Sequence, residues 1–186
     1  RQLLEVRMVP VTSLWLPILL SAVLVFVVSS VIHMFTPWHK GDIRGVPGEA
    51  DAMAALRKLN IPPGDYVMPY AGSMEAMKDP AYAARLEAGP AVIMTVWRGS
   101  TAMGGQLAAW FVYGLVVSVF AGYLAGAALP TGAPYLDVFR FAGTTAFVAY
   151  GAGAWPITIW YHRGVGLAAK ATFDALLYGA VTAGVF

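Results

Sequence analysis

The chain contains no cysteine, and charged residues are scarce. The absence of cysteine excludes disulfide bonds, thiol catalysis, thiolate metal ligands and cysteine-bound iron–sulfur clusters. Only 12% of the 186 residues are Asp, Glu, Lys or Arg, about half of the roughly 25% found in a typical globular domain. So small a charged fraction argues against a water-soluble domain. The net charge is only +2 and the basic residues form no tract, so we expect no nucleic-acid partner.

Apolar residues are abundant and form long segments: 59% of the residues are apolar, and the mean hydropathy is +0.65. A transmembrane helix requires about 20 mostly apolar residues. Four stretches meet this requirement, namely residues 12–35, 106–129, 136–160 and 166–186. We therefore expect an all-α, multi-pass integral membrane protein with four transmembrane helices in a lipid bilayer. Short connections predict that the last three helices are antiparallel neighbours.

Residues 36–105 separate the first two stretches and hold seven of the ten acidic residues. We expect them to form a small extramembrane α/β cap. Local signals predict its elements in order: a helix over 49–59, an extended segment over 65–70, a helix over 80–88 capped by Asp79, and a strand over 91–97. A segment of this size is marginally stable alone. We therefore expect the cap to pack on the helices or on a partner.

Basic residues near the ends of the apolar stretches predict the orientation in the membrane. The side that holds the cap carries five of them: Lys40, Arg44, Arg98, Arg163 and Lys170. The opposite side carries Arg1 and Arg7. The excess of basic residues on the cytoplasmic side of membrane proteins places the cap in the cytoplasm and both termini outside.

Small residues recur every four positions in three of the stretches, a spacing that lets membrane helices approach closely. They are Gly114, Ser118, Gly122 and Gly126 in the second stretch, Thr145, Ala149 and Gly153 in the third, and Ala171, Ala175, Gly179 and Ala183 in the fourth. This pattern predicts a tightly packed trio of helices. The first stretch has no glycine, which places it at the periphery, facing lipid or another subunit.

Lys170 and Asp174 are charged residues inside the fourth apolar stretch. Charges within a membrane helix are costly and usually face an interior, so this pair is a candidate ion or proton relay. The alternative is structural: Lys170 extends to the interface, and Asp174 pairs with it, with Arg140 or with Arg163. Asp137 and Arg140, three residues apart at the start of the third stretch, are expected to form an interfacial ion pair.

The three histidines, His33, His39 and His162, are expected near the same membrane face. A metal site there is geometrically possible, with Glu49, Asp42 or Met34 as a fourth ligand. Their spacing matches no known metal-binding motif, so ordinary interfacial histidines are favoured and no metal or other cofactor is predicted.

No catalytic motif is present, so an enzyme is disfavoured and no catalytic residue is assigned. The leading hypothesis is a non-catalytic accessory or assembly subunit of a larger membrane protein complex, with other membrane subunits and lipids as partners. The second is a small oligomeric transporter or ion- or proton-conducting protein that uses Lys170 and Asp174. The third is a membrane metalloprotein that uses the three histidines.

Overall fold

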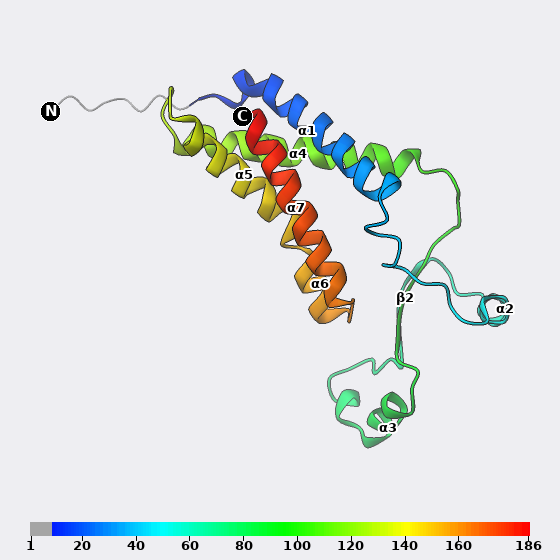
Figure 1. Ribbon diagram of the computed structural model, residues 1–186. Helices are drawn as coiled ribbons and strands as arrows, with labels where there is room; N and C mark the ends of the chain where they lie inside the picture. The colour runs from blue at the N-terminus through cyan, green and yellow to red at the C-terminus, as the bar shows by residue number, and fades with distance from the viewer. Residues whose placement is uncertain (1–8) are drawn as a thin grey trace. The chain divides into compact units, whose positions relative to one another are not determined.

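The computed structural model describes residues 9–186, and the protein is mostly helical, with one small two-stranded sheet. Arg1 and Arg7, on which the orientation argument partly depends, lie outside the described residues. The chain divides into two compact units. A helical unit comprises Arg1–Ile43 and Ala102–Phe186, and an inserted unit comprises Arg44–Thr101. Figure 1 shows the helices of both units in their order along the chain.

Two helices of the helical unit are long and apolar enough to cross a membrane: Val11–Phe35 and Gly104–Ala128. The first consists of a 3-10 turn, the α-helix α1 (Trp15–Ser30) and a π-helical turn (Val31–Phe35). The second is the single α-helix α4. Both coincide closely with the first two apolar stretches of the sequence. Neither stretch contains a charged residue, and Pro17 lies in the first turn of α1, where a proline removes no intrahelical hydrogen bond.

The third apolar stretch, predicted as one helix over 136–160, forms two. They are α5 (Tyr135–Gly151) and α6 (Ala154–Trp160), and α7 (Val165–Val185) follows them. Pro156 explains the break, since a proline cannot donate to the carbonyl four residues earlier and its ring clashes with that group. The carbonyl in question belongs to Ala152, within the interruption between α5 and α6.

Helices α5 and α7 form the most extensive helix–helix contact of the unit and run side by side in Figure 1. Glycines make the approach possible. A Cβ atom on Gly179 would lie 2.9 Å from the backbone oxygen of Gly143, and one on Gly143 would lie 2.8 Å from the Cβ atom of Ala183. The packing positions predicted for α4 are all buried, as are three of the four in α7; Ala171 is only partly buried.

Two packing expectations are wrong. In α5 the buried small residues are Ala142, Ala146 and Gly151, whereas Ala149 is exposed, because the face that meets α7 is rotated from the predicted one. The first helix is not peripheral either: α1 contacts both α4 and α7. It needs no glycine for this, since its buried face already includes small side chains: Ile18, Ser21, Ala22, Val25 and Ser29.

In the inserted unit the predicted elements are confirmed closely: they are α2 (Glu49–Leu59), β1 (Gly64–Met68), α3 (Pro80–Ala88) and β2 (Val92–Val96). The strands pair antiparallel, with Tyr66 opposite Met94. The Asp79 carboxylate accepts a hydrogen bond from the Ala81 backbone N–H and so caps α3. No residue of Arg44–Thr101 is fully buried, so this unit has no dry core of its own.

Candidate functional site

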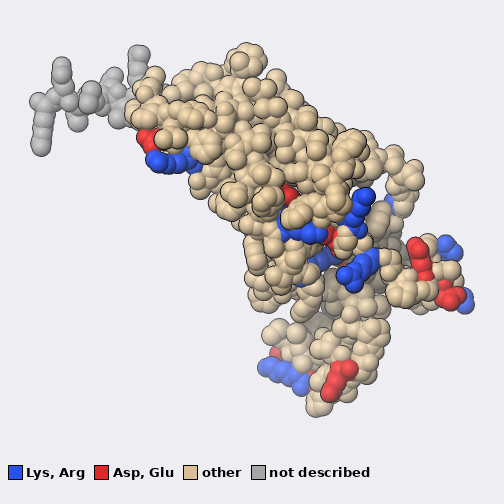
Figure 2. Space-filling view, in the orientation of Figure 1, with Lys and Arg blue, Asp and Glu red and all other residues tan. Residues whose placement is uncertain are grey.

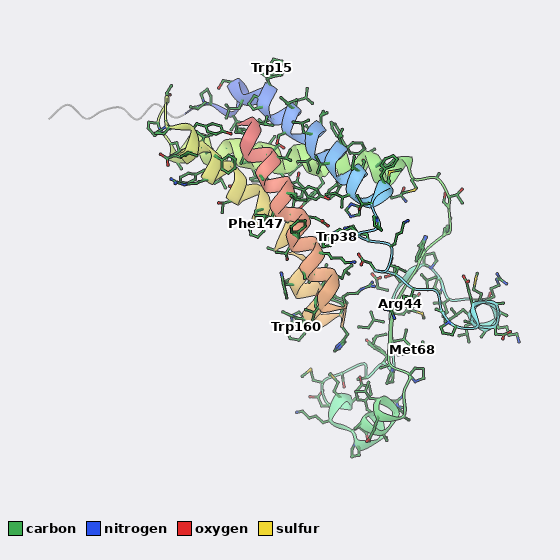
Figure 3. All side chains as sticks on the ribbon, in the orientation of Figure 1. Trp15, Trp38, Arg44, Met68, Phe147 and Trp160 are labelled. Carbon is green, nitrogen blue, oxygen red and sulfur yellow. The ribbon has the colours of Figure 1, made fainter. Side chains whose placement is uncertain are left out.

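The candidate site lies within the helical unit, where the segment that leaves the first helix folds against α7. Thr36 is extended, the conformation favoured before Pro37, and this ends the helix. A turn follows, closed by a hydrogen bond from the Lys40 N–H to the Pro37 carbonyl. Figure 3 shows Trp38, in this segment, beside α7. The Trp38 indole Nε1 donates to Asp174 Oδ1 at 3.1 Å, and Lys170 Nζ donates to the Trp38 carbonyl at 2.6 Å.

His39 occupies the centre of the site, between two carboxylates. Its Nδ1 lies 2.6 Å from Asp42 Oδ2, and its Nε2 lies 2.8 Å from Asp174 Oδ2. A neutral imidazole has only one N–H, so His39 donates to two ionised carboxylates only as an imidazolium. Lys170 adds the second positive charge, with Nζ 2.6 Å from Asp42 Oδ1. Two cations therefore balance two anions.

Burial makes this balance necessary. Asp174 is only 4% exposed, and unpaired buried carboxylates are strongly disfavoured. Lys170 also lies over the Trp38 ring, with Nζ 5.5 Å from the ring centroid. The hydrogen bonds from Lys170 and His39 hold the pKa of Asp42 below its ordinary value, outweighing the opposing effect of desolvation. Asp42 therefore remains ionised at neutral pH.

His33 stacks on His39, with ring centroids 4.2 Å apart and an angle of 8° between the planes. His33 Nδ1 lies 2.9 Å from the Ser29 carbonyl oxygen, which can only accept, so Nδ1 carries a proton. The neutral ring then has its lone pair on Nε2. One ligand atom each from His33, His39 and Asp174 lie within 4.8 Å of one another.

A column of hydroxyl groups continues from Asp174 into the helical unit. Tyr178 and Thr182 follow Asp174 at intervals of four residues on the buried face of α7. Five buried hydroxyl oxygens have no hydrogen-bond partner among the described residues: those of Ser21, Ser118, Tyr150, Tyr178 and Thr182. The Tyr150 and Tyr178 rings are 5.4 Å apart, joining α5 to this face. Buried polar groups without partners are rare in proteins and commonly mark sites of water or ions.

An open cavity of about 610 Å³ adjoins the charged residues. Its walls are mostly apolar, and Lys170 and Asp174 are the charged residues that line it. The full lining is Ile32, Thr36, Pro37, Trp38, Lys170, Phe173, Asp174 and Leu177. Asp174 thus both lines the cavity and bonds His39.

The structure brings together some of the residues that the sequence predicted as site residues and keeps others apart. Lys170 and Asp174 do not bond each other; they are linked through Asp42 and His39. His162 is exposed and does not join the group formed by the other two histidines, whose third member is Asp174. Asp137 and Arg140 form an exposed ion pair at 3.1 Å, as expected.

Sequence reasoning missed the role of Trp38, which was considered only as an interfacial aromatic, and placed Asp42 only as a possible metal ligand. The available signal was local. Trp38, His39 and Asp42 bring three polar or hydrogen-bonding side chains directly after an uncharged helix. Trp38 and His39 both bond Asp174, which is more than 130 residues away, so the sequence spacing does not identify it.

The chain matches no family model. Neither curated proteins nor solved structures show a match to it. The functional argument therefore depends on the geometry of the site.

Proposed function

We propose that this chain is a four-span integral membrane protein whose helical unit translocates a cation. The spans are the helix over Val11–Phe35, α4, α5 continued by α6, and α7. Support for lipid as the surrounding medium comes from the distribution of side chains. The buried positions of α4 hold glycine, alanine, serine and one valine, while large apolar side chains such as Val112, Val116 and Phe120 are exposed. Membrane helices pack in this way.

The outer surface agrees with this assignment. On the face shown in Figure 2, wide areas over the helices carry no charged side chain. Trp15 and Trp160 are both exposed and lie at opposite ends of the helical unit in Figure 3. Tryptophan is enriched at the two interfaces of a bilayer, so this placement suits a bundle that spans it.

The observation that carries the translocation proposal is the buried face of α7. Asp174, Tyr178 and Thr182 are buried on one face of α7, and the two hydroxyls lie between Asp174 and the C-terminal end of the helix. An ionisable residue inside a membrane helix usually marks an ion or substrate pathway. The cavity beside Asp174 gives a cation access to the carboxylate. Ser118 and Ser21, on α4 and α1, add two further buried hydroxyls without partners among the described residues.

The test is cation flux in liposomes that contain the purified full chain, measured separately for protons and for divalent metal ions. We expect Asp174→Asn to lower the flux at least about tenfold, because the neutral amide cannot attract a cation as the carboxylate does. Thr182→Val should also lower the flux without lowering thermal stability, since it replaces an unsatisfied buried hydroxyl by a methyl group. Asp137→Asn is the matched control and should leave the flux unchanged.

Two results would contradict translocation: wild-type liposomes no leakier than empty ones to either cation, or full flux through Asp174→Asn. Equal losses in Asp174→Asn and Asp137→Asn would likewise remove the assignment, because they would trace the effect to net charge rather than to the buried carboxylate.

A second candidate function is that of an accessory or assembly subunit of a larger membrane complex. The inserted unit favours it: large apolar side chains of α2, namely Met53, Leu56 and Leu59, are exposed, as is Trp97 after β2. Extensive exposed apolar surface on a small unit indicates a binding partner. Purification in mild detergent followed by mass spectrometry should then recover foreign chains in stoichiometric amounts. A homogeneous oligomer of this chain alone would argue against an accessory role.

A further inference from the structure

We propose that His33, His39 and Asp174 bind a divalent transition-metal ion of the zinc class. Binding goes beyond the proposed function and stands independently of it. That the same metal ion is the translocated cation is a further step, which rests on the proposed function.

The donor set defines the class of metal. Two imidazole nitrogens and one carboxylate suit zinc, cobalt(II) or iron(II), which prefer nitrogen with some oxygen. Calcium and magnesium prefer sites made of oxygen alone. Ligand atoms of the three residues lie within 4.8 Å of one another. Zinc–ligand distances of about 2.0–2.2 Å require them to lie within about 4.4 Å. His33 is exposed on the π-helical turn. Its ring stacks nearly parallel to His39, so metal binding requires the His33 ring to turn until its lone pair points at the same ion.

Each of the three ligands already has an outer partner that orients it. His39 Nδ1 bonds the Asp42 carboxylate, and His33 Nδ1 bonds the Ser29 carbonyl oxygen. Asp174 Oδ1 accepts from the Trp38 indole, which leaves Oδ2 toward His39. Metal-binding histidines almost always donate their second N–H to a carboxylate or a backbone carbonyl. Both histidines of the cluster meet this condition.

The contact between His39 Nε2 and Asp174 Oδ2 identifies where positive charge is required. When a neutral ring keeps its one proton on Nδ1, toward Asp42, Nε2 and the ionised Asp174 carboxylate are both acceptors, yet they lie only 2.8 Å apart. In the metal-free protein a proton on Nε2 joins them. A metal ion displaces that proton to solvent and accepts the nitrogen lone pair, while the Nδ1 proton stays on its bond to Asp42. Lys170 continues to neutralise Asp42.

Metal binding is measured on the full chain in detergent, stripped with EDTA and dialysed against zinc or cobalt(II). We expect one equivalent per chain by elemental analysis. His33→Ala and Asp174→Asn should weaken binding at least as much as the roughly 10–100-fold loss typical of removing an outer partner. Asp42→Asn should fall within that range. His162→Ala is the matched control, since His162 lies outside the cluster, and should bind normally. Less than one equivalent, or equal affinity in all variants, would overturn the proposal.

His33→Cys provides a second test that loss of folding cannot imitate. Because the natural chain has no cysteine, a sulfur-to-cobalt charge-transfer band could arise only from the introduced thiolate. We expect the band in His33→Cys and not in His162→Cys. Its absence from a cobalt-loaded, folded His33→Cys would overturn the site. Metal binding without any cation flux would contradict the proposed function alone. Proton flux in a protein that binds no metal would contradict this inference alone.

Discussion

Gly179→Ala should destabilise the helical unit by about 1–3 kcal/mol, the usual cost of inserting a methyl group into a well-packed interior. The new Cβ atom would lie 2.9 Å from the Gly143 carbonyl oxygen and 3.2 Å from the Phe147 backbone nitrogen. Both are backbone atoms of α5, so no side-chain rotation relieves the overlap. The helices must separate along their most extensive contact. The free energy of unfolding in mixed detergent micelles, titrated with SDS, measures the loss.

Gly184→Ala is the matched control, in the same helix and with the same added group. A Cβ atom there meets nothing within 4 Å, and residue 184 is exposed. Alanine favours helix over glycine by up to about 1 kcal/mol, so this variant should be neutral or slightly more stable. If both variants shifted the unfolding free energy equally, close α5–α7 packing would not be the property that requires glycine at position 179.

How far the sequence predicts the structure depends on whether the signal is local. The inserted unit was predicted almost residue by residue because its helices end at residues with clear local preferences. Asp79 caps α3, Pro80 starts it, and Asn60 ends α2 in the left-handed conformation. Each preference operates within one helical turn. The alternation of β-branched residues likewise identified β2 without reference to its partner strand.

Helix packing was predicted less well because a small-residue pattern does not define which neighbour it meets. In α5, overlapping sets of small residues are offset from one another. Only the fold shows that Gly143 and Gly151 meet α7, rather than the predicted set with Ala149. The placement of α1 failed for a related reason. Its lack of glycine was taken to exclude close packing, yet Ser21 and Ala22 are small enough for burial.

The site itself could be predicted only in part. Lys170 and Asp174 were identified because charges in an apolar helix are costly, an argument that requires no tertiary structure. His33, His39 and His162 were grouped because the expected topology places all three near one membrane face. Joining these two groups requires the fold of α7 against residues 36–43, which brings His39 to Asp174 across 135 positions. No spacing rule spans that distance, so Asp174 rather than His162 as the third member became visible only in the structure.

His39→Ala should be the most destabilising single change in the charged cluster, costing about 3–5 kcal/mol in protein kept metal-free with EDTA. It removes the imidazolium from Asp174, which is 4% exposed and would retain only the Trp38 indole as partner. Asp42 would still bond Lys170, so the loss falls mainly on Asp174. Unfolding in SDS-containing micelles measures this cost. His162→Ala, at an exposed position, should change the unfolding free energy by no more than about 0.5 kcal/mol.

A double variant separates the charge effect from simple loss of packing. When Asp174→Asn is added to His39→Ala, the buried carboxylate disappears together with its cation. The double variant should therefore be more stable than His39→Ala alone, with a coupling energy of about 0.5–3 kcal/mol between the two positions. Additive losses would mean that His39 and Asp174 act independently, and the imidazolium between two carboxylates would then not describe the metal-free protein. A rescue by Asp174→Asn would instead establish that a cation at this point is what permits Asp174 to be buried as an anion.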